Sequence, residues 1–243
     1  MSEPRHVVVL TGAGVSADSG VATFRDAGGL WEGHDVMQVA TPEGWAADPA
    51  LVWRFYQLRR AALASVEPNP AHRALVALED HLRDCGGSFF LVTQNVDDLH
   101  ERAGSRNLLH MHGELARLRC ERCDEEIVDL EHTDERRFVP CASCGYERLR
   151  PSVVWFGEMP IGIERIEAAV QRATDFLAIG TSGEVYPAAG MLGLARQFGA
   201  RTTVFALERP SNLGREDTFV SGRAATTIPT WVDEFVRSGS RAD

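Results

Sequence analysis

The stretch from residue 6 to residue 17 places the strongest constraint on the fold of this 243-residue chain. Its first part, His6-Val7-Val8-Val9-Leu10, is the kind of β-branched run that forms a buried strand of a parallel sheet. The turn Gly12-Ala13-Gly14-Val15-Ser16-Ala17 follows directly, and we expect this Gly-x-Gly-x-x-Ala pattern to open a helix. Glycines allow the backbone to approach a phosphate, and a helix N-terminus offers it free N–H groups. The stretch therefore predicts an α/β domain with a dinucleotide site.

The rest of the chain repeats this alternation of apolar strands and amphipathic helices. Strands are expected at residues 88–92, 107–111, 175–179, 201–207 and 224–228, and helices at residues 49–65, 71–84, 98–104, 161–174, 187–198 and 229–237. This order predicts a doubly wound, Rossmann-like and mostly parallel α/β sheet. We assign residues 1–116 and 151–243 to that domain, with a helical insert at about residues 28–70.

Four of the five cysteines form two Cys-x-x-Cys pairs, Cys120 with Cys123 and Cys141 with Cys144. Two such turns can offer four thiolates to one tetrahedral zinc ion. Disulfides are the alternative, but a cytosolic chain would not keep them. Residues 117–150 are rich in charge and poor in apolar runs, so we expect a small zinc-binding module that depends on the metal. Four thiolates leave no position open for water, which makes this zinc structural rather than catalytic.

Polar side chains follow two of the expected strands at their carboxyl ends. Gln94, Asn95 and Asp97 come directly after the strand at residues 88–92, and His112 follows the next apolar segment. Open α/β sheets bind ligands beyond the carboxyl ends of their strands. A loop of turn-forming residues that merely caps a helix is the alternative interpretation. We predict a functional site here, because two adjacent strand ends could pool these side chains.

The charge balance excludes some classes of partner. The net charge is -10 and the isoelectric point is about 5.3, which argues against a general binder of nucleic acid or of anionic membranes. No run approaches the roughly 20 apolar residues of a membrane span, and no signal peptide is evident. We expect a cytoplasmic protein and, without a specific argument from the sequence, a monomer.

Residues 21–45 argue against an ordinary dehydrogenase. Such an enzyme would have a second strand about 20 residues after the glycine turn, ending in an acidic residue for the ribose hydroxyls. No strand is evident in this stretch, so we expect a long, ordered and functional loop. Arg25 and Asp26 could contact a cofactor there, or could form a local surface ion pair.

Tyr56 and Arg59 lie three positions apart on the helix expected at residues 49–65, so they share a face. An arginine beside a tyrosine hydroxyl is a suitable receptor for a carboxylate. Composition alone favours the other interpretation, in which Arg59 and Arg60 face water.

In combination, these motifs resemble the sirtuin family over residues 7–236, which is nearly the whole chain. The resemblance rests on residues 12–20, Phe24-Arg25, Gln94-Asn95-Val96-Asp97, His112-Gly113-Glu114, the four paired cysteines, Phe156-Gly157-Glu158 and Gly180-Thr181-Ser182, which all occur in the order of the family. The overall pattern is most similar to bacterial class III members.

The resemblance implies NAD-dependent removal of acyl groups from lysine, with nicotinamide and O-acyl-ADP-ribose as products. It makes His112 the general base and Asn95 its catalytic companion. The NAD-binding residues it implies are Gly12, Ala13, Gly14, Ser16, Ala17, Phe24, Arg25, Trp31, Gln94, Asn95, Val96, Asp97, Gly180, Thr181, Ser182, Ala206, Leu207, Glu208 and Ala224. The acyl-lysine peptide would lie between two segments and contact Val154, Phe156, Gly157, Glu158, Val185 and Tyr186.

The resemblance also changes the interpretation of Tyr56 and Arg59. Class III sirtuins carry a Tyr-x-x-Arg pair at this helix that selects acidic acyl groups, so the resemblance implies removal of succinyl and malonyl groups beside deacetylation. Two positions depart from the family pattern: Thr23 replaces an acidic residue before Phe24, and Ala206 replaces an asparagine. Neither touches the reacting centre, although the loss of the amide at Ala206 removes a possible contact to the adenosine ribose.

Three other functions were weighed against deacylation. ADP-ribosyl transfer to a protein would use the same ribose carbon and is the main alternative. A dehydrogenase lacks support from the stretch at residues 21–45. A zinc-module binding protein with a vestigial cofactor fold would not need Gln94, Asn95, Asp97 and His112 together.

Overall fold

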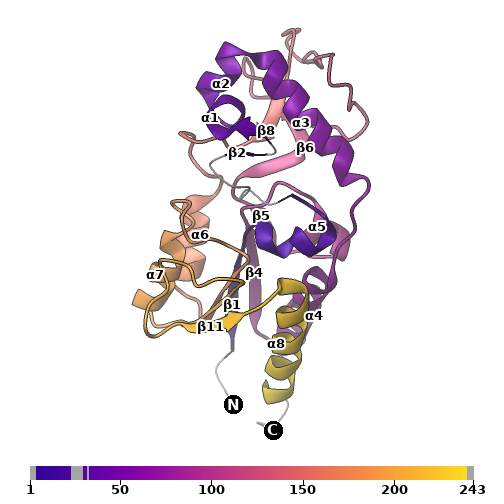
Figure 1. The fold of residues 1–243 in the computed structure, drawn as a ribbon. Coiled ribbons are helices and arrows are strands. Elements are labelled where there is room, and N and C mark those ends of the chain that lie inside the picture. Colours follow the sequence, from indigo (N-terminus) through magenta and orange to yellow (C-terminus); the bar gives the residue numbers. More distant parts are fainter. Residues whose placement is uncertain (1–3, 23–29, 32, 240–243) are drawn as a thin grey trace.

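The parallel sheet predicted from the sequence is the centre of the computed structural model, which describes residues 4–22, 30–31 and 33–239 (Figure 1). In this part of the chain six strands pair in the order β11-β10-β9-β1-β4-β5, and every pair is parallel. The strands are β1 (His6–Thr11), β4 (Ser88–Thr93), β5 (Leu108–His110), β9 (Asp175–Ile179), β10 (Arg201–Ala206) and β11 (Thr218–Ser221). Thr11 at the end of β1 pairs with both Thr93 and Ile179, so three central strands end at the same level.

Helices cover both faces of this sheet, as Figure 1 shows. Val7 and Val9 of β1 pack with α4 (Pro70–Asp84) and α8 (Ala224–Gly239), whereas Val8 and Leu10 pack with α6 (Ile163–Val170) and α7 (Gly190–Gln197) on the other face. Side chains alternate between the two faces of a strand, and β1 is apolar on both because both are covered. The doubly wound α/β fold is confirmed.

A third hydrophobic cluster is formed by segments at one end of the sheet, whose ribbons lie in the upper part of Figure 1. It joins the helices α1 (Val36–Val39), α2 (Pro42–Ala47) and α3 (Pro49–Leu63) to an antiparallel sheet of order β7-β6-β8. The strands of this sheet are β7 (Glu126–Val128), β6 (Gly113–Arg119) and β8 (Arg150–Val153). The helical insert and the cysteine-bearing segment thus share one core. The division of the chain into a Rossmann-like domain and a separate zinc module stays a prediction.

Local sequence explains where the main helices begin. Asp48 caps α3 by accepting a hydrogen bond from the Leu51 N–H at 2.9 Å, and a proline occupies the first helical position. Asn69 caps α4 in the same way, and His72 closes the capping box from the third helical position. The short helix α5 (Leu99–Ala103) ends at a left-handed glycine, as expected.

Two expectations about secondary structure were wrong. The glycine turn opens no α-helix but two 3-10 turns, Ala13–Val15 and Ala17–Ser19, because Gly20 with a φ of 90° reverses the chain there. Residues 224–228 form no strand but the start of α8, since Ile228 and Val232 at helical spacing face the core despite Pro229 inside the helix. The sixth strand is β11 instead.

Residues 21–45 also contain more structure than expected. A short hairpin of β2 (Leu30–Trp31) and β3 (His34–Asp35) precedes α1. Its two-residue strands are too short to produce a recognisable apolar pattern in the sequence. Among the described residues, no helix has the length and apolar character needed to cross a membrane.

Candidate active site

A cleft of about 900 Å³ lies beyond the carboxyl ends of the central strands, between the parallel sheet and the third cluster. It brings together residues that are as far apart in the sequence as Gly12 and Ala224. The predicted site residues that line it are Gly12, Ala13, Gly14, Ala17, Tyr56, Arg59, Gln94, Asn95, Val96, Asp97, His112, Val154, Phe156, Gly157, Glu158, Gly180, Thr181, Ser182, Val185, Tyr186, Ala206, Leu207, Glu208 and Ala224. Phe24 and Arg25 lie outside the described residues, and of Trp31 only the backbone, in β2, is described.

Three glycines make the floor of this cleft where β1 and β9 end. The Gly14 N–H donates to the Gly180 carbonyl at 2.9 Å, and the Gly12 N–H donates to the Ile179 carbonyl at 2.9 Å. A Cβ on Gly14 would lie 2.7 Å from the Gly180 Cα, and one on Gly180 would lie 2.5 Å from the Val15 nitrogen. Only glycine fits at these positions, so the backbone itself forms the surface that a dinucleotide would meet.

The buried Ser16 hydroxyl connects several polar side chains behind the glycine floor of the cleft. Its hydroxyl accepts a hydrogen bond from the Asn95 side-chain amide at 3.1 Å and lies 3.5 Å from Nε2 of His72. Nδ1 of His72 accepts from the Asn69 N–H, so its Nε2 carries the hydrogen that points to Ser16. With two donors aimed at its oxygen, the Ser16 hydroxyl donates onward to Asp97. Burial raises the pKa of Asp97, and the Ser16 bond and the Leu99 N–H oppose that rise.

Sequence analysis missed the two histidines of this network. His72 and His100 are buried with ring centroids 4.8 Å apart, and His100 lies 3.1 Å from the Thr11 hydroxyl. Burial lowers the pKa of His72 to about 4 and that of His100 well below its usual value, so both rings are neutral. The only sequence signal was the spacing of Asn69 and His72 across the start of a helix.

His112 enters the cleft from the turn between β5 and β6. Its Nδ1 lies 3.2 Å from the Gln94 carbonyl oxygen, which can only accept, so Nδ1 carries the hydrogen in the neutral ring. Nε2 is then the nitrogen with the lone pair, as a general base requires. Burial lowers the pKa of His112 below its usual value, although the Gln94 carbonyl opposes this. The neutral, base-competent form is therefore present at physiological pH.

Tyr56 and Arg59 both line the cleft, on the side formed by α3. The Tyr56 hydroxyl accepts a hydrogen bond from the Trp155 indole N–H at 2.9 Å, and burial raises its pKa. The Arg59 guanidinium lies over the Phe55 ring, 3.2 Å from its centroid. Arg60 is only 5% exposed and lies 3.6 Å from Asp129. The expectation from composition that Arg60 faces water was wrong, because the cysteine-bearing segment, with Asp129, covers this side of α3.

The segment that follows β8 is held by a buried ion pair. Arg150 donates two hydrogen bonds to Glu158, at 2.7 and 3.0 Å, and its guanidinium stacks on the Trp155 ring at 3.4 Å. Glu158 also accepts from the Trp155 N–H at 2.8 Å. The guanidinium keeps the pKa of Glu158 low despite burial, which opposes it. These contacts of Arg150 and Glu158 fix the position of Trp155, and its indole N–H in turn orients the hydroxyl of Tyr56.

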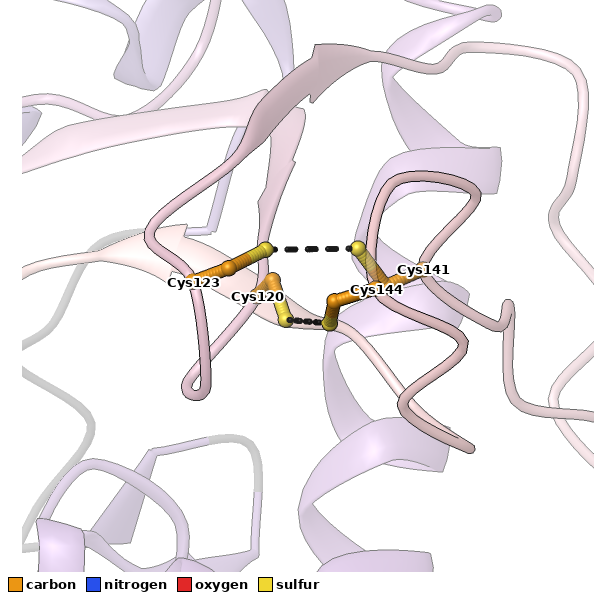
Figure 2. Close-up of side chains that lie close together, drawn as sticks. All are labelled: Cys120, Cys123, Cys141 and Cys144. Carbon is orange, nitrogen blue, oxygen red and sulfur yellow. Dashed lines mark hydrogen bonds between the residues drawn. The ribbon is translucent and has the colours of Figure 1, made fainter.

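The two cysteine pairs converge as predicted (Figure 2). Sγ of Cys120 lies 3.6 Å from Sγ of Cys144, and Sγ of Cys123 lies 3.6 Å from that of Cys141. All four sulfur atoms lie within 4.8 Å of one another, and all four residues are free cysteines. Zn–S bonds of about 2.3 Å in a tetrahedron place the sulfur atoms about 3.8 Å apart. The cluster therefore fits one zinc ion, and a disulfide would need a separation of about 2 Å.

Comparisons with known proteins agree with this geometry. The Sir2 family model matches residues 12–187. The NAD-dependent protein deacylase of Caulobacter vibrioides is 49% identical over 231 residues, which cover 95% of this chain and 96% of the relative. The NAD-dependent protein deacylase SIR2rp3 of Trypanosoma brucei brucei is 47% identical over 236 residues, 95% of this chain and 94% of the relative.

Solved structures give the same result. A mutant Sir2 homologue in complex with ADP-ribose superposes with a TM-score of 0.89 at 36% identity, over 99% of this chain and 95% of that one. A Sir2 homologue bound to NAD superposes with a TM-score of 0.86 at 36% identity, over 98% and 91% of the two chains. This chain belongs to the Sir2 family, and the predicted resemblance to sirtuins is confirmed.

The four-cysteine cluster predicts a specific effect of losing one thiolate. The wild-type protein should bind about one zinc ion per chain, and the Cys141→Ser protein should bind far less. It should also lose about 3 kcal/mol or more of unfolding free energy, because Cys141 belongs to the third hydrophobic cluster. Metal analysis and urea unfolding measure the two effects. The Cys85→Ser protein is the control, since Cys85 is exposed and outside the cluster. Equal zinc content in all three proteins would contradict the assignment.

Proposed function

We propose that this chain is an NAD-dependent protein-lysine deacylase that removes acidic acyl groups, succinyl and malonyl, as well as acetyl groups. The products would be the free lysine, nicotinamide and O-acyl-ADP-ribose. The observation that carries the proposal is the pairing in one cleft of a glycine floor fit for a dinucleotide with His112, whose Nε2 is held as the basic nitrogen. The names of the relatives support it, and they do not favour ADP-ribosyl transfer as the main activity.

The residues around the cleft divide the work of binding. Gly12, Gly14 and Gly180 would accommodate the phosphates, and Thr181 with Ala206 would lie along the adenosine half. Asn95 and Asp97 would hold the ribose and the nicotinamide amide. NAD, when bound, supplies a ribose carbon whose bond to nicotinamide can be broken. Asp97 is already an acceptor for the Ser16 hydroxyl and the Leu99 N–H, so its carboxylate is held in place before any ligand arrives.

His112 would take the proton from a ribose hydroxyl. Its Nδ1–H is committed to the Gln94 carbonyl, which orients the ring and stabilises the imidazolium that forms. Because Gln94 follows β4 and His112 follows β5, the pairing of these two strands sets the position of the base. The base is thus placed by the parallel sheet and not by a mobile surface loop.

The substrate peptide would enter between Phe156-Gly157-Glu158 and Val185-Tyr186. Tyr186 is 74% exposed and Phe156 is also exposed, and both line the cleft. These two aromatic side chains are therefore accessible to a peptide that enters there. A solved Sir2 enzyme at 29% identity, with a TM-score of 0.74, is bound to a myristoylated histone peptide. That neighbour supports an acyl-lysine peptide as the kind of substrate.

Arg59 and Tyr56 would receive the carboxylate of an acidic acyl group. An arginine in a partly desolvated cleft pairs with a carboxylate through charge-assisted hydrogen bonds, and a tyrosine hydroxyl can bind the second oxygen. The indole of Trp155 donates to the Tyr56 oxygen, which turns the hydroxyl hydrogen away from the indole. The acyl end would therefore meet one cation and one oriented hydroxyl.

Arg59→Met should separate the two acyl classes. We expect kcat/KM for a succinyl-lysine peptide to fall by about 100-fold or more, because its carboxylate would be buried without a cation. The value for the acetyl peptide should stay within about threefold, since acetyl carries no charge. Arg54→Met on the exposed side of the same helix is the matched control. Equal losses for both peptides would refute the acidic acyl pocket.

The protonation of His112 predicts the acid side of the pH profile. A base works only when neutral, and burial lowers the pKa of His112, so activity should persist below pH 6.5 and fall only as pH drops through the lowered pKa. The kcat/KM of the wild-type protein against pH measures this limb. His112→Ala should lower kcat/KM by about 100-fold to 10,000-fold and keep the zinc. An acid limb at or above pH 6.5 would contradict the role of His112.

A further inference from the structure

His110, the last residue of β5, makes two hydrogen bonds with its ring. Its Nδ1 lies 2.9 Å from the carbonyl oxygen of Asn95. Its Nε2 lies 2.6 Å from a carboxylate oxygen of Glu101 on α5. The ring is buried, whereas the Glu101 side chain is 40% exposed. His110 does not line the cleft, so its ring lies behind the binding surface described above, which Asn95 helps to form.

These two partners fix the protonation of the ring. A backbone carbonyl can only accept, so Nδ1 must carry a hydrogen. A neutral imidazole would then present a bare lone pair at Nε2 to the oxygen of Glu101. One proton must lie between the two groups, and it resides on the more basic one, which is imidazole with a reference pKa of about 6.5 against about 4.3 for Glu. His110 is therefore an imidazolium that donates at both nitrogens.

The charges around His110 agree with this state. Glu101 faces the ring from α5, Glu114 from β6, and Asp97 from the loop before α5. Arg117 of β6 lines the same small pocket as His110, and it is paired with Glu114 at 2.7 Å. His100 on α5 is neutral. Burial would lower the pKa of His110, but the bond and charge of Glu101, with the Asn95 carbonyl and Glu114, raise it above its usual value.

A metal ion is the other interpretation of this cluster, because one donor atom each of Glu101, His110 and Glu114 lies within 4.8 Å of the others. Two ligands on one tetrahedral zinc, at about 2.0–2.2 Å each, would lie about 3.3 Å apart. The separation of 2.6 Å between His110 and Glu101 is that of a charge-assisted hydrogen bond instead. Glu114 is moreover engaged by Arg117.

We propose that His110, held as an imidazolium by Glu101, is a positioning residue that locks Asn95 from behind the NAD site. The inference rests on the proposed function only for the role of Asn95. Three bonds hold that residue: its carbonyl accepts from His110, its N–H donates to the Thr93 hydroxyl at 3.0 Å, and its side-chain amide donates to Ser16 at 3.1 Å. His110 supplies the only one of these three that is charge-assisted.

His110 and His112 are two positions apart, yet they need opposite protonation states. His112 must be neutral to accept a proton, whereas His110 must be charged to hold both partners. Since its folded pKa is raised, the locked state is complete below that pKa and is lost as pH rises through it. When His110 loses its proton, the single remaining hydrogen serves either Asn95 or Glu101, and not both. Activity should therefore fall as the pH rises through the pKa of His110, and this fall is the basic limb of the profile of kcat/KM against pH.

Glu101→Gln is the decisive variant, because it removes the charge and keeps both bonds. The new amide can donate to Nε2 of a neutral ring, whose Nδ1–H still serves Asn95. We expect near wild-type activity at neutral pH and loss of the basic limb assigned to His110. Glu101→Ala removes the partner that orients the ring through Nε2, so the bond to Asn95 is no longer held in place, and the KM for NAD should rise by about tenfold with the peptide KM within about twofold. Glu234→Gln, an exposed carboxylate of α8, is the matched control.

Nitrogen–proton NMR of the histidine rings of the wild-type protein tests the ion pair without relying on catalysis. Two ring N–H resonances for His110 at neutral pH, and a pKa above 6.5, are expected. One N–H, or a pKa at or below 6.5, overturns the proposal. So does a basic limb that is unchanged in Glu101→Gln. Should the protein bind NAD but deacylate no peptide, the proposed function fails, while the NMR result and calorimetric NAD affinity of Glu101→Ala still decide the role of His110.

Discussion

The site depends on the fact that neighbouring parallel strands of this sheet end at one level. Thr11 pairs with Thr93 on one side and with Ile179 on the other, so the residues that follow β1, β4 and β9 meet at one edge. The backbones after β1 and β9 approach so closely that Gly12, Gly14 and Gly180 accept no side chain. The register of the strands thereby sets the shape of the glycine floor of the cleft, and β5, paired to β4, ends in His110 and leads to His112.

Local patterns predicted the parts of the protein that short segments determine. The apolar runs with polar ends gave the central strands and the cleft residues Gln94, Asn95 and Asp97, since burial on both faces and the function of strand ends leave a local signature. The two Cys-x-x-Cys pairs predicted the four-cysteine cluster, because their spacing is also a local signature. The start of α8 was misjudged because the β-branched residues Thr226, Thr227 and Ile228 suggest a strand locally and Pro229 suggests the first position of a helix, while packing against α4 decides for a helix from Ala224.

Long-range contacts produced what the sequence could not show. Arg60 is buried because Asp129, which lies 69 positions later, faces it across the shared core of the two inserts. His72 and His100 look like ordinary helix residues until Ser16 and Thr11 are placed beside them. The ionisation of His110 likewise follows from a carbonyl and a carboxylate that only the fold brings together. Tertiary partners, and not residue type, decide which histidine is suited to act as a base and which to carry a charge.

The central claim is that this cleft couples NAD to the removal of acidic acyl groups from lysine. The most direct test treats one lysine peptide, succinylated or acetylated, with purified protein in the presence and absence of NAD, and follows peptide mass and nicotinamide together. We expect NAD-dependent loss of succinyl, with one nicotinamide released for each acyl group removed. Nicotinamide release without loss of either acyl group, or loss of acetyl alone, would contradict it.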